Sequence, residues 1–81
     1  MIKHYRKKPV VVETIEWDGK KSTFEKIKKW NKNTTVNNDI LYIPTLEGIM
    51  KAQLTDIIIK GVKGEIYPCR QDIFHETYEE V

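Results

Sequence analysis

The chain has 81 residues, of which 40% are hydrophobic and 32% are charged, with a formal net charge of +2. This length predicts a single domain over residues 1–81, and such a small domain buries only about 60% of its unfolded surface, so a homo-oligomer is expected. No apolar run exceeds four residues and there is one cysteine, which excludes transmembrane and disulfide-scaffold classes. Eleven Ile and six Val, against three Leu and one Ala, favour strands over a helix bundle.

The charge is unevenly distributed along the chain. Residues 1–32 hold ten Lys and Arg and four Asp and Glu, a net +6, whereas residues 33–81 hold four and eight, a net −4. This asymmetry indicates either a surface that binds anions or an ordinary solvated helix. The basic start leads into only four proline and valine residues, too few for a signal-peptide core. With the lone Cys69 unable to form an internal disulfide, a cytoplasmic location is expected, with no membrane contact.

The first predicted element is a strand over residues 10–17. Its alternation of apolar and polar residues is imperfect, because Glu13 and Glu16 fall on opposite faces at a period of two. One face of the strand is therefore expected to be exposed to solvent. Asp18 and Gly19 tolerate positive φ and are expected to close the strand with a turn.

An amphipathic helix is predicted over residues 22–31. Ser22 and Glu25 form a capping box, in which each side chain bonds the backbone amide of the other residue. The apolar face recurs every three residues and consists of Phe24, Ile27 and Trp30. The asparagines that follow end the helix, since Asn competes for backbone bonds and accepts left-handed geometry, and residues 34–39 are expected to form a loop.

Two further strands are predicted in the middle of the chain. Residues 40–45 favour a strand in which Pro44 cannot donate to a ladder, so Pro44 should lie at an edge or a bulge. Glu47 and Gly48 are typical of a tight turn leading into a strand over residues 49–54.

The last part of the chain predicts two strands and a short helix. Residues 57–59 are three consecutive isoleucines, which indicate burial on both faces and a central strand. Lys63 and Gly64 predict a hairpin turn into a returning strand at residues 65–67. Asp72 is expected to cap a helix over residues 73–79, whose Phe74 and Tyr78 lie four apart on one face. The sum is an α+β domain of β-α-β-β-β-β-α order, an antiparallel sheet of four to five strands with two helices.

The sequence offers little for catalysis or metal binding. His4, His75 and Cys69 are too scattered for a zinc site, and no metalloprotease, calcium-loop, Walker, Rossmann or nucleophile-elbow motif occurs. His75 is more simply a surface histidine than a base for Cys69. We therefore expect no enzyme, no cofactor and no metal.

Cationic and aromatic residues gather near the predicted last hairpin: Lys60, Lys63, Tyr67, Arg70 and Asp72. Arg70 can present a planar fork to a phosphate, and Tyr67 can present a stacking face to a base. The ordinary alternative is that hairpin lysines are solvated and that the tyrosine fills the core with its hydroxyl at the rim.

Two stretches of the chain resemble one family of small, uncharacterised bacteriophage and prophage proteins. The first is the opening Y-R-K-K-P-V-V-V-E with the following W-D-G, and the second is the ending I-I-K-G-V-K-G-E-I-Y-P-C with D-I-F and T-Y-E after it. Together they cover about half of the chain. The relatives usually have Gly and an aromatic residue where this chain has Thr55 and Ile57, and often Lys where it has Arg70.

The resemblance implies a phage protein that acts on host systems inside the infected cell. Small non-enzymatic phage proteins commonly act on host systems, including by sequestering nucleotide signals of antiviral defence, and the sequestering proteins are often compact α/β oligomers with ligand pockets between subunits. The leading hypothesis is such a non-catalytic protein, binding a small anionic ligand through Lys60, Lys63, Tyr67 and Arg70, with Trp17 as a stacking platform. The first alternative is a nucleic-acid-binding protein that uses the helix lysines Lys20, Lys21, Lys26, Lys28, Lys29 and Lys32. A module that binds a host protein is the second.

Overall fold

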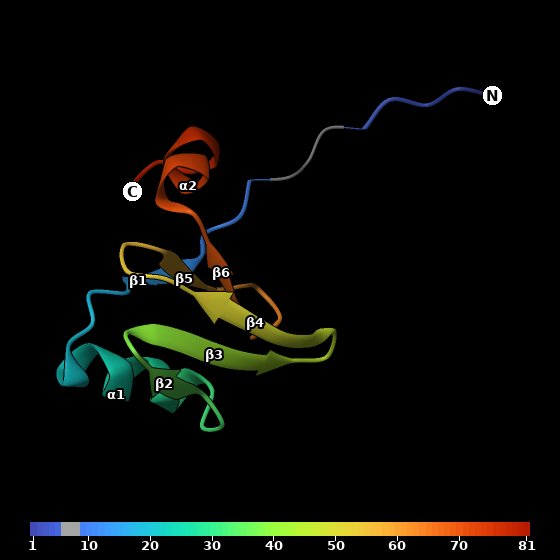
Figure 1. Ribbon diagram of the computed structural model, residues 1–81. Coiled ribbons are helices and arrows are strands. Elements are labelled where there is room, and N and C mark those ends of the chain that lie inside the picture. Colours follow the sequence, from blue (N-terminus) through green and yellow to red (C-terminus); the bar gives the residue numbers. More distant parts are fainter. Residues whose placement is uncertain (6–8) are drawn as a thin grey trace.

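The computed structural model describes residues 1–5 and 9–81. Two helices and six strands follow one another in the order β1 (Glu13–Glu16), α1 (Lys21–Trp30), β2 (Thr35–Asn37), β3 (Ile40–Thr45), β4 (Gly48–Ala52), β5 (Ile57–Lys60), β6 (Ile66–Cys69) and α2 (Gln71–Thr77). The α+β class and both helices are confirmed. The strands, however, number six and form two sheets of three, where the sequence predicted four to five in one sheet. Figure 1 shows α1 beside the β2-β3-β4 sheet and α2 at the opposite end of the molecule.

The first sheet has β5 at its centre, with β1 and β6 antiparallel on either side. The three isoleucines of β5 are 5%, 0% and 1% exposed, so both faces of this strand are buried. The predicted central position of residues 57–59 is confirmed. The physical reason is that only a strand with neighbours on both edges and layers on both faces can hold consecutive apolar side chains.

The second sheet has β3 at its centre, between β2 and β4. Pro44 lies on this strand beyond the end of its pairing with β2, where β3 has a neighbouring strand on one side only, as expected for an edge position. Two features accommodate it: the β2 partners of β3 end with Thr35 opposite Tyr42, and the Pro44 carbonyl accepts a bond from Asn31 Nδ2 at 2.9 Å. At this end of β3, α1 rather than a strand lies beside Pro44, so the missing N–H costs no ladder bond.

The predicted loop at residues 34–39 is wrong, because it contains β2. Asn38 and Asp39 have φ values of 52° and 63° and form a two-residue hairpin between β2 and β3. Asn and Asp are the residues that accept these left-handed conformations without glycine. The signal was present in the sequence, but the flanking residues Thr35 and Val36 are exposed and gave no apolar alternation.

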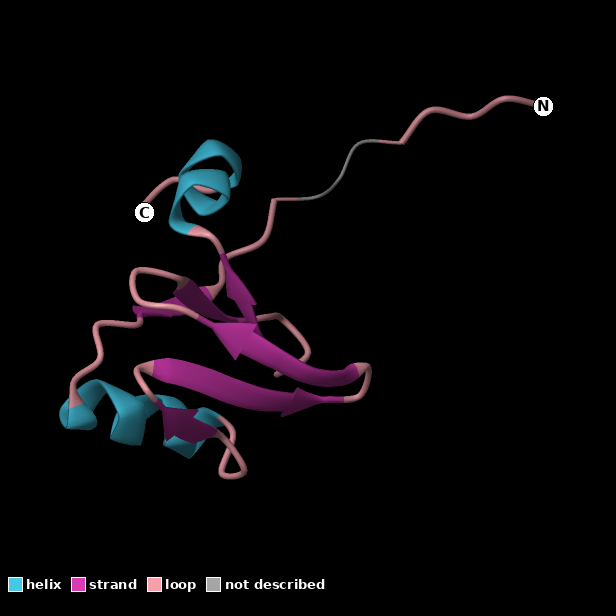
Figure 2. Ribbon diagram, viewed as in Figure 1, coloured by secondary structure: helices cyan, strands magenta, loops and turns pink. Residues whose placement is uncertain are grey.

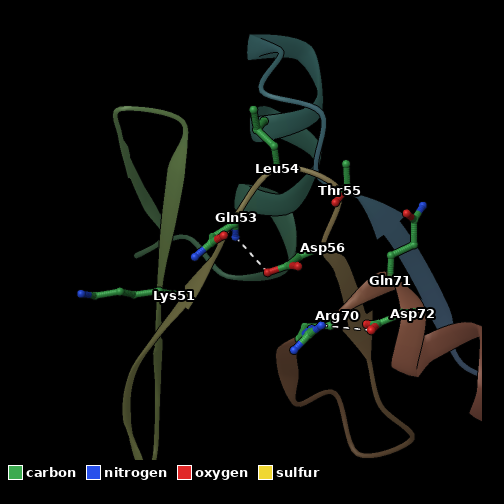
Figure 3. A pocket seen from close by; sticks show the side chains of 8 residues that line it. All are labelled: Lys51, Gln53, Leu54, Thr55, Asp56, Arg70, Gln71 and Asp72. Atoms are coloured by element: carbon green, nitrogen blue, oxygen red, sulfur yellow. Dashed lines mark hydrogen bonds and ion pairs between the residues drawn. The ribbon is translucent and has the colours of Figure 1, made fainter.

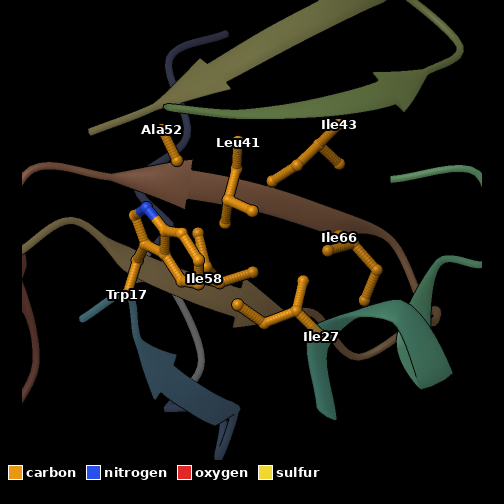
Figure 4. Close-up of a cluster of buried hydrophobic side chains, with 7 residues drawn as sticks. All are labelled: Trp17, Ile27, Leu41, Ile43, Ala52, Ile58 and Ile66. Atoms are coloured by element: carbon orange, nitrogen blue, oxygen red, sulfur yellow. The ribbon is translucent and has the colours of Figure 1, made fainter. Parts of the chain in front are cut away.

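Both sheets and α1 enclose one buried cluster (Figure 4). It consists of Trp17, Ile27, Leu41, Ile43, Ala52, Ile58 and Ile66. Phe24 and Trp30 pack against this cluster on either side of Ile27, which confirms the predicted apolar face of α1. Each fully buried isoleucine or leucine contributes roughly 1.5–3 kcal/mol relative to an exposed one.

The helix starts differ from the sequence predictions. α1 begins at Lys21 with Lys20 as N-cap, so Ser22 lies inside the first turn and no capping box forms. Asp18 sets this start, because its Oδ1 accepts the Lys20 N–H at 3.0 Å. α2 likewise begins one residue before Asp72, with Arg70 as N-cap and no side-chain capping bond. The predicted Asp72 cap is therefore wrong.

The ends of the elements also differ in detail. α1 ends at Trp30, one residue before the predicted end at Asn31, and Asn31 is extended, with φ −143°, rather than left-handed. β1 is shorter than the predicted residues 10–17, because its only partner, β5, offers four residues. Residues 1–5 are exposed and lie away from both sheets (Figure 2). In the described ranges 1–5 and 9–81, no helix is long and apolar enough to cross a membrane.

Candidate functional site

The five residues predicted to bind an anionic ligand do not meet in one site. In the β5–β6 ladder, Lys60 is opposite Ile66 at the hairpin end, whereas Ile57 is opposite Cys69 at the other end. Lys63 belongs to the hairpin and Arg70 follows Cys69, so the two cations lie at opposite ends of the sheet. At about 3.3 Å per residue, the four-residue ladder alone separates them by roughly 10 Å.

Lys60 and Tyr67 also lie on opposite faces of this sheet. Lys60 is two residues from the core residue Ile58 and shares its face, whereas Tyr67 is opposite Ile59 on the other face. The ammonium of Lys60 lies 5.9 Å from the centre of the Trp30 ring. Lys60 therefore contacts α1 on the face of the sheet opposite Tyr67, so these two predicted residues are not brought together.

Trp17 does not provide a stacking platform, because its side chain is only 1% exposed. Its ring belongs to the core cluster, and its indole Nε1 donates to the Asp39 carbonyl at 2.7 Å. A ring that is covered on both faces has no surface for a base. The assignment of Trp17 to the ligand site is corrected accordingly.

Tyr67 is half-buried and lies beside Tyr78, the residue that follows α2. Burial, followed by the neighbouring Tyr78 hydroxyl, raises the pKa of Tyr67 from 10.0 to about 12. Tyr78 in turn stacks on Phe74 with 4.9 Å between ring centres, which confirms that these two aromatics share one face. Tyr67 thus anchors the C-terminal helix on the sheet.

Of the five residues predicted to bind the ligand, Arg70 lines a cavity of about 530 Å³, and Trp17 borders a second one of about 490 Å³. We call the first cavity the Lys51–Arg70 groove; it lies between the β4–β5 connection and the start of α2 (Figure 3). Its lining consists of Lys51, Gln53, Leu54, Thr55, Asp56, Arg70, Gln71 and Asp72. No local pattern predicted that Lys51 and Gln53 would join Arg70, because nearly twenty residues separate them along the chain.

The carboxylates of the groove are already engaged. Asp72 pairs with Arg70 at 3.0 Å, with the two side chains 62% and 72% exposed, and such an open pair contributes about 0–1 kcal/mol. Asp56 Oδ2 accepts the Gln53 N–H at 2.9 Å. The ammonium of Lys51 lies at the rim, 5.8 Å from the centre of the Tyr42 ring, and has no ion pair within the described residues. Because the Arg70–Asp72 pair is weak and Lys51 has no ion pair in the described residues, the side chains of Arg70 and Lys51 can both bind an anion.

A second cationic surface covers α1 and the residues beside it. All six lysines of the first alternative are exposed, and none forms an ion pair within residues 1–5 and 9–81. At the start of α1, Lys20, Lys21 and Phe24 line the second cavity, of about 490 Å³, against the β2–β3 hairpin. We call this the α1 lysine surface.

Reactive groups are sparse in the part of the chain that the structure describes. Burial raises the pKa of the Cys69 thiol, which reduces its thiolate fraction at neutral pH. No group of three His, Cys, Asp or Glu side chains in residues 1–5 and 9–81 is close enough to hold a metal ion. Comparison with known proteins finds no family model, curated protein or solved structure that matches this chain.

Proposed function

We propose that this protein is a non-catalytic binding protein that holds a small anionic ligand in the Lys51–Arg70 groove. The observation that carries the proposal is the position of Arg70 in a cavity whose volume lies in the range of small-molecule sites. The resemblance to small phage proteins supports a role inside infected bacteria, where sequestering a nucleotide signal would block a host defence.

The chemistry of the lining suits a phosphate group. The Arg70 guanidinium can exchange Asp72 for a phosphate, because a planar fork binds either anion through two parallel hydrogen bonds. Lys51 stands at the rim on a flexible stem, and a rotation about its side-chain bonds brings its ammonium toward the same anion. The amides of Gln53 and Gln71 offer neutral donors and acceptors for a base or a sugar.

The test is calorimetric titration of the purified protein with a panel of mononucleotides and cyclic dinucleotides. Arg70→Ala is expected to weaken binding by about tenfold or more, since a charge-assisted hydrogen bond contributes about 1.5–3 kcal/mol. Lys51→Ala is expected to weaken it less. Lys63→Ala is the matched control, because this exposed lysine lies on the hairpin away from the groove. Equal affinity of the wild type and Arg70→Ala for every nucleotide bound would exclude the groove as the site.

A second candidate function is nucleic-acid binding by the α1 lysine surface. It is favoured by the six exposed lysines without ion pairs, which would release counterions on contact with phosphates. Fluorescence anisotropy with single- and double-stranded DNA should then show affinity that falls steeply with salt. Replacing Lys28 and Lys29 by Gln should reduce the salt slope, while replacing Lys51 and Lys63 should not. A slope near zero would reject this candidate.

A further inference from the structure

β4 is an edge strand with a free side. It pairs only with β3, and in the described residues no backbone hydrogen bond links its other side to the rest of the chain, although β6 lies close to β4 and Lys51 borders the groove beside the start of α2. Its register with β3 is continuous, without a bulge, and Lys51 is its single charged residue. Ile49 is 68% exposed on this strand, and Leu46 in the adjoining turn is fully exposed. A regular, apolar edge of this kind is a template for another strand.

The direction of the free backbone groups follows from Pro44. The Pro44 carbonyl bonds to Asn31, on the side of β3 away from β4. In an antiparallel pair, the backbone N–H and C=O groups of two opposite residues either all point toward the partner strand or all point away from it. Ile49 is opposite Pro44, so its N–H and C=O point away from β3. Lys51, two residues further, points the same way. Ile49 and Lys51 therefore hold the free donors and acceptors of the edge.

We propose that the β4 edge binds β4 of a second copy of this chain, antiparallel and about a two-fold axis at Ile49. The two Ile49 residues then exchange both of their free hydrogen bonds, and the two β2-β3-β4 sheets become one sheet of six strands. Two-fold symmetry is satisfied because the same edge serves both copies.

The choice of a second copy rests on charge complementarity. With Ile49 on the axis, Lys51 of each copy faces Glu47 of the partner subunit, in the turn just before β4, and both side chains are exposed and free of ion pairs within residues 1–5 and 9–81. The register therefore makes two opposite-charge pairs across the axis. The same register brings the two exposed Ile49 side chains into contact. Pro44, opposite Ile49 in each copy, lies on the same face of the sheet.

This interface shares Lys51 with the proposed ligand groove, so it is tested without a ligand. Sedimentation equilibrium over a series of concentrations should give a dimer of 19.2 kDa, twice the chain mass of 9.6 kDa. Ile49→Lys should give a monomer. Val62→Lys, which changes a residue of similar exposure, 66%, on a different loop, should remain a dimer. Ile49 is outside the groove lining, so Ile49→Lys separates failure of the dimer from failure of ligand binding.

The register is tested by charge exchange. Lys51→Glu or Glu47→Lys alone should weaken association by roughly tenfold, because each places like charges opposite one another twice. The double variant should restore it to within about twofold of the wild type, as expected when a charge pair is simply reversed. A wild type that stays monomeric at all concentrations would overturn the proposal. So would a Val62→Lys variant that dissociates like Ile49→Lys, or a double variant as weak as the single ones.

Discussion

Thr55 adopts a backbone conformation that disfavours its side chain, and glycine at this position should stabilise the protein. Its φ is 76°, in the left-handed region. The Trp17 N–H donates to the Asp56 carbonyl at 2.9 Å, and the Thr55 N–H donates to the Trp17 carbonyl at 2.8 Å. Two residues thus oppose one at the end of the β1–β5 ladder, which is a bulge whose first residue is usually a left-handed glycine.

The magnitude follows from two opposing terms. Left-handed geometry costs an L-residue roughly 1–2 kcal/mol. Replacing Thr55 by glycine also makes the unfolded chain more flexible, which reduces the gain in the free energy of unfolding by about 0.4–1 kcal/mol. The exposed Thr55 side chain makes no hydrogen bond among the described residues, so its removal costs little. We expect Thr55→Gly to increase the free energy of unfolding by about 1 kcal/mol, which is about 5 °C in Tm for a domain of this size.

The assay is urea and thermal unfolding followed by circular dichroism. Thr14→Gly is the matched control, because Thr14 is also exposed but lies in β1, where glycine should destabilise by roughly 0.5–1 kcal/mol. Thr55→Asn should be intermediate, since Asn tolerates the left-handed region better than a β-branched residue. A Thr55→Gly protein no more stable than the wild type would refute the reasoning, as would equal stabilisation by Thr14→Gly.

Two more predictions concern Trp17 and Tyr67. Trp17→Phe removes the 2.7 Å indole bond to the Asp39 carbonyl and leaves a void, so it should lower the free energy of unfolding by about 1–3 kcal/mol in urea titrations. The half-buried Trp30→Phe should cost less, and an equal cost would contradict the role given to the indole bond. For Tyr67, the folded pKa of about 12 exceeds the unfolded value of 10.0, so the stability due to the neutral phenol is complete below pH 10 and lost as pH rises through 12. Tyr67→Phe should flatten this fall, and an unchanged fall would assign it to other groups.

The sequence by itself determined the elements whose signals are local. Three adjacent isoleucines require two buried faces, so residues 57–59 had to be a central strand. The three-residue spacing of Phe24, Ile27 and Trp30 required an amphipathic helix, and the structure buries that face. Glycines mark two of the three hairpins, at Gly48 with φ 114° and Gly64 with φ 83°, because L-residues rarely adopt such angles.

Only the tertiary structure decided which of these elements meet, and therefore where a ligand could bind. Lys60 and Tyr67 lie close in sequence but on opposite faces of one sheet. Successive side chains of a strand point to opposite faces, and Tyr67 is opposite Ile59, the residue next to Lys60. Trp17 was taken into the core by contacts with residues far along the chain. Lys51 joined Arg70 because β4 and the start of α2 converge at one end of the fold. Such proximities depend on how two sheets pack, and packing between distant segments leaves no periodicity in the sequence from which it could be predicted.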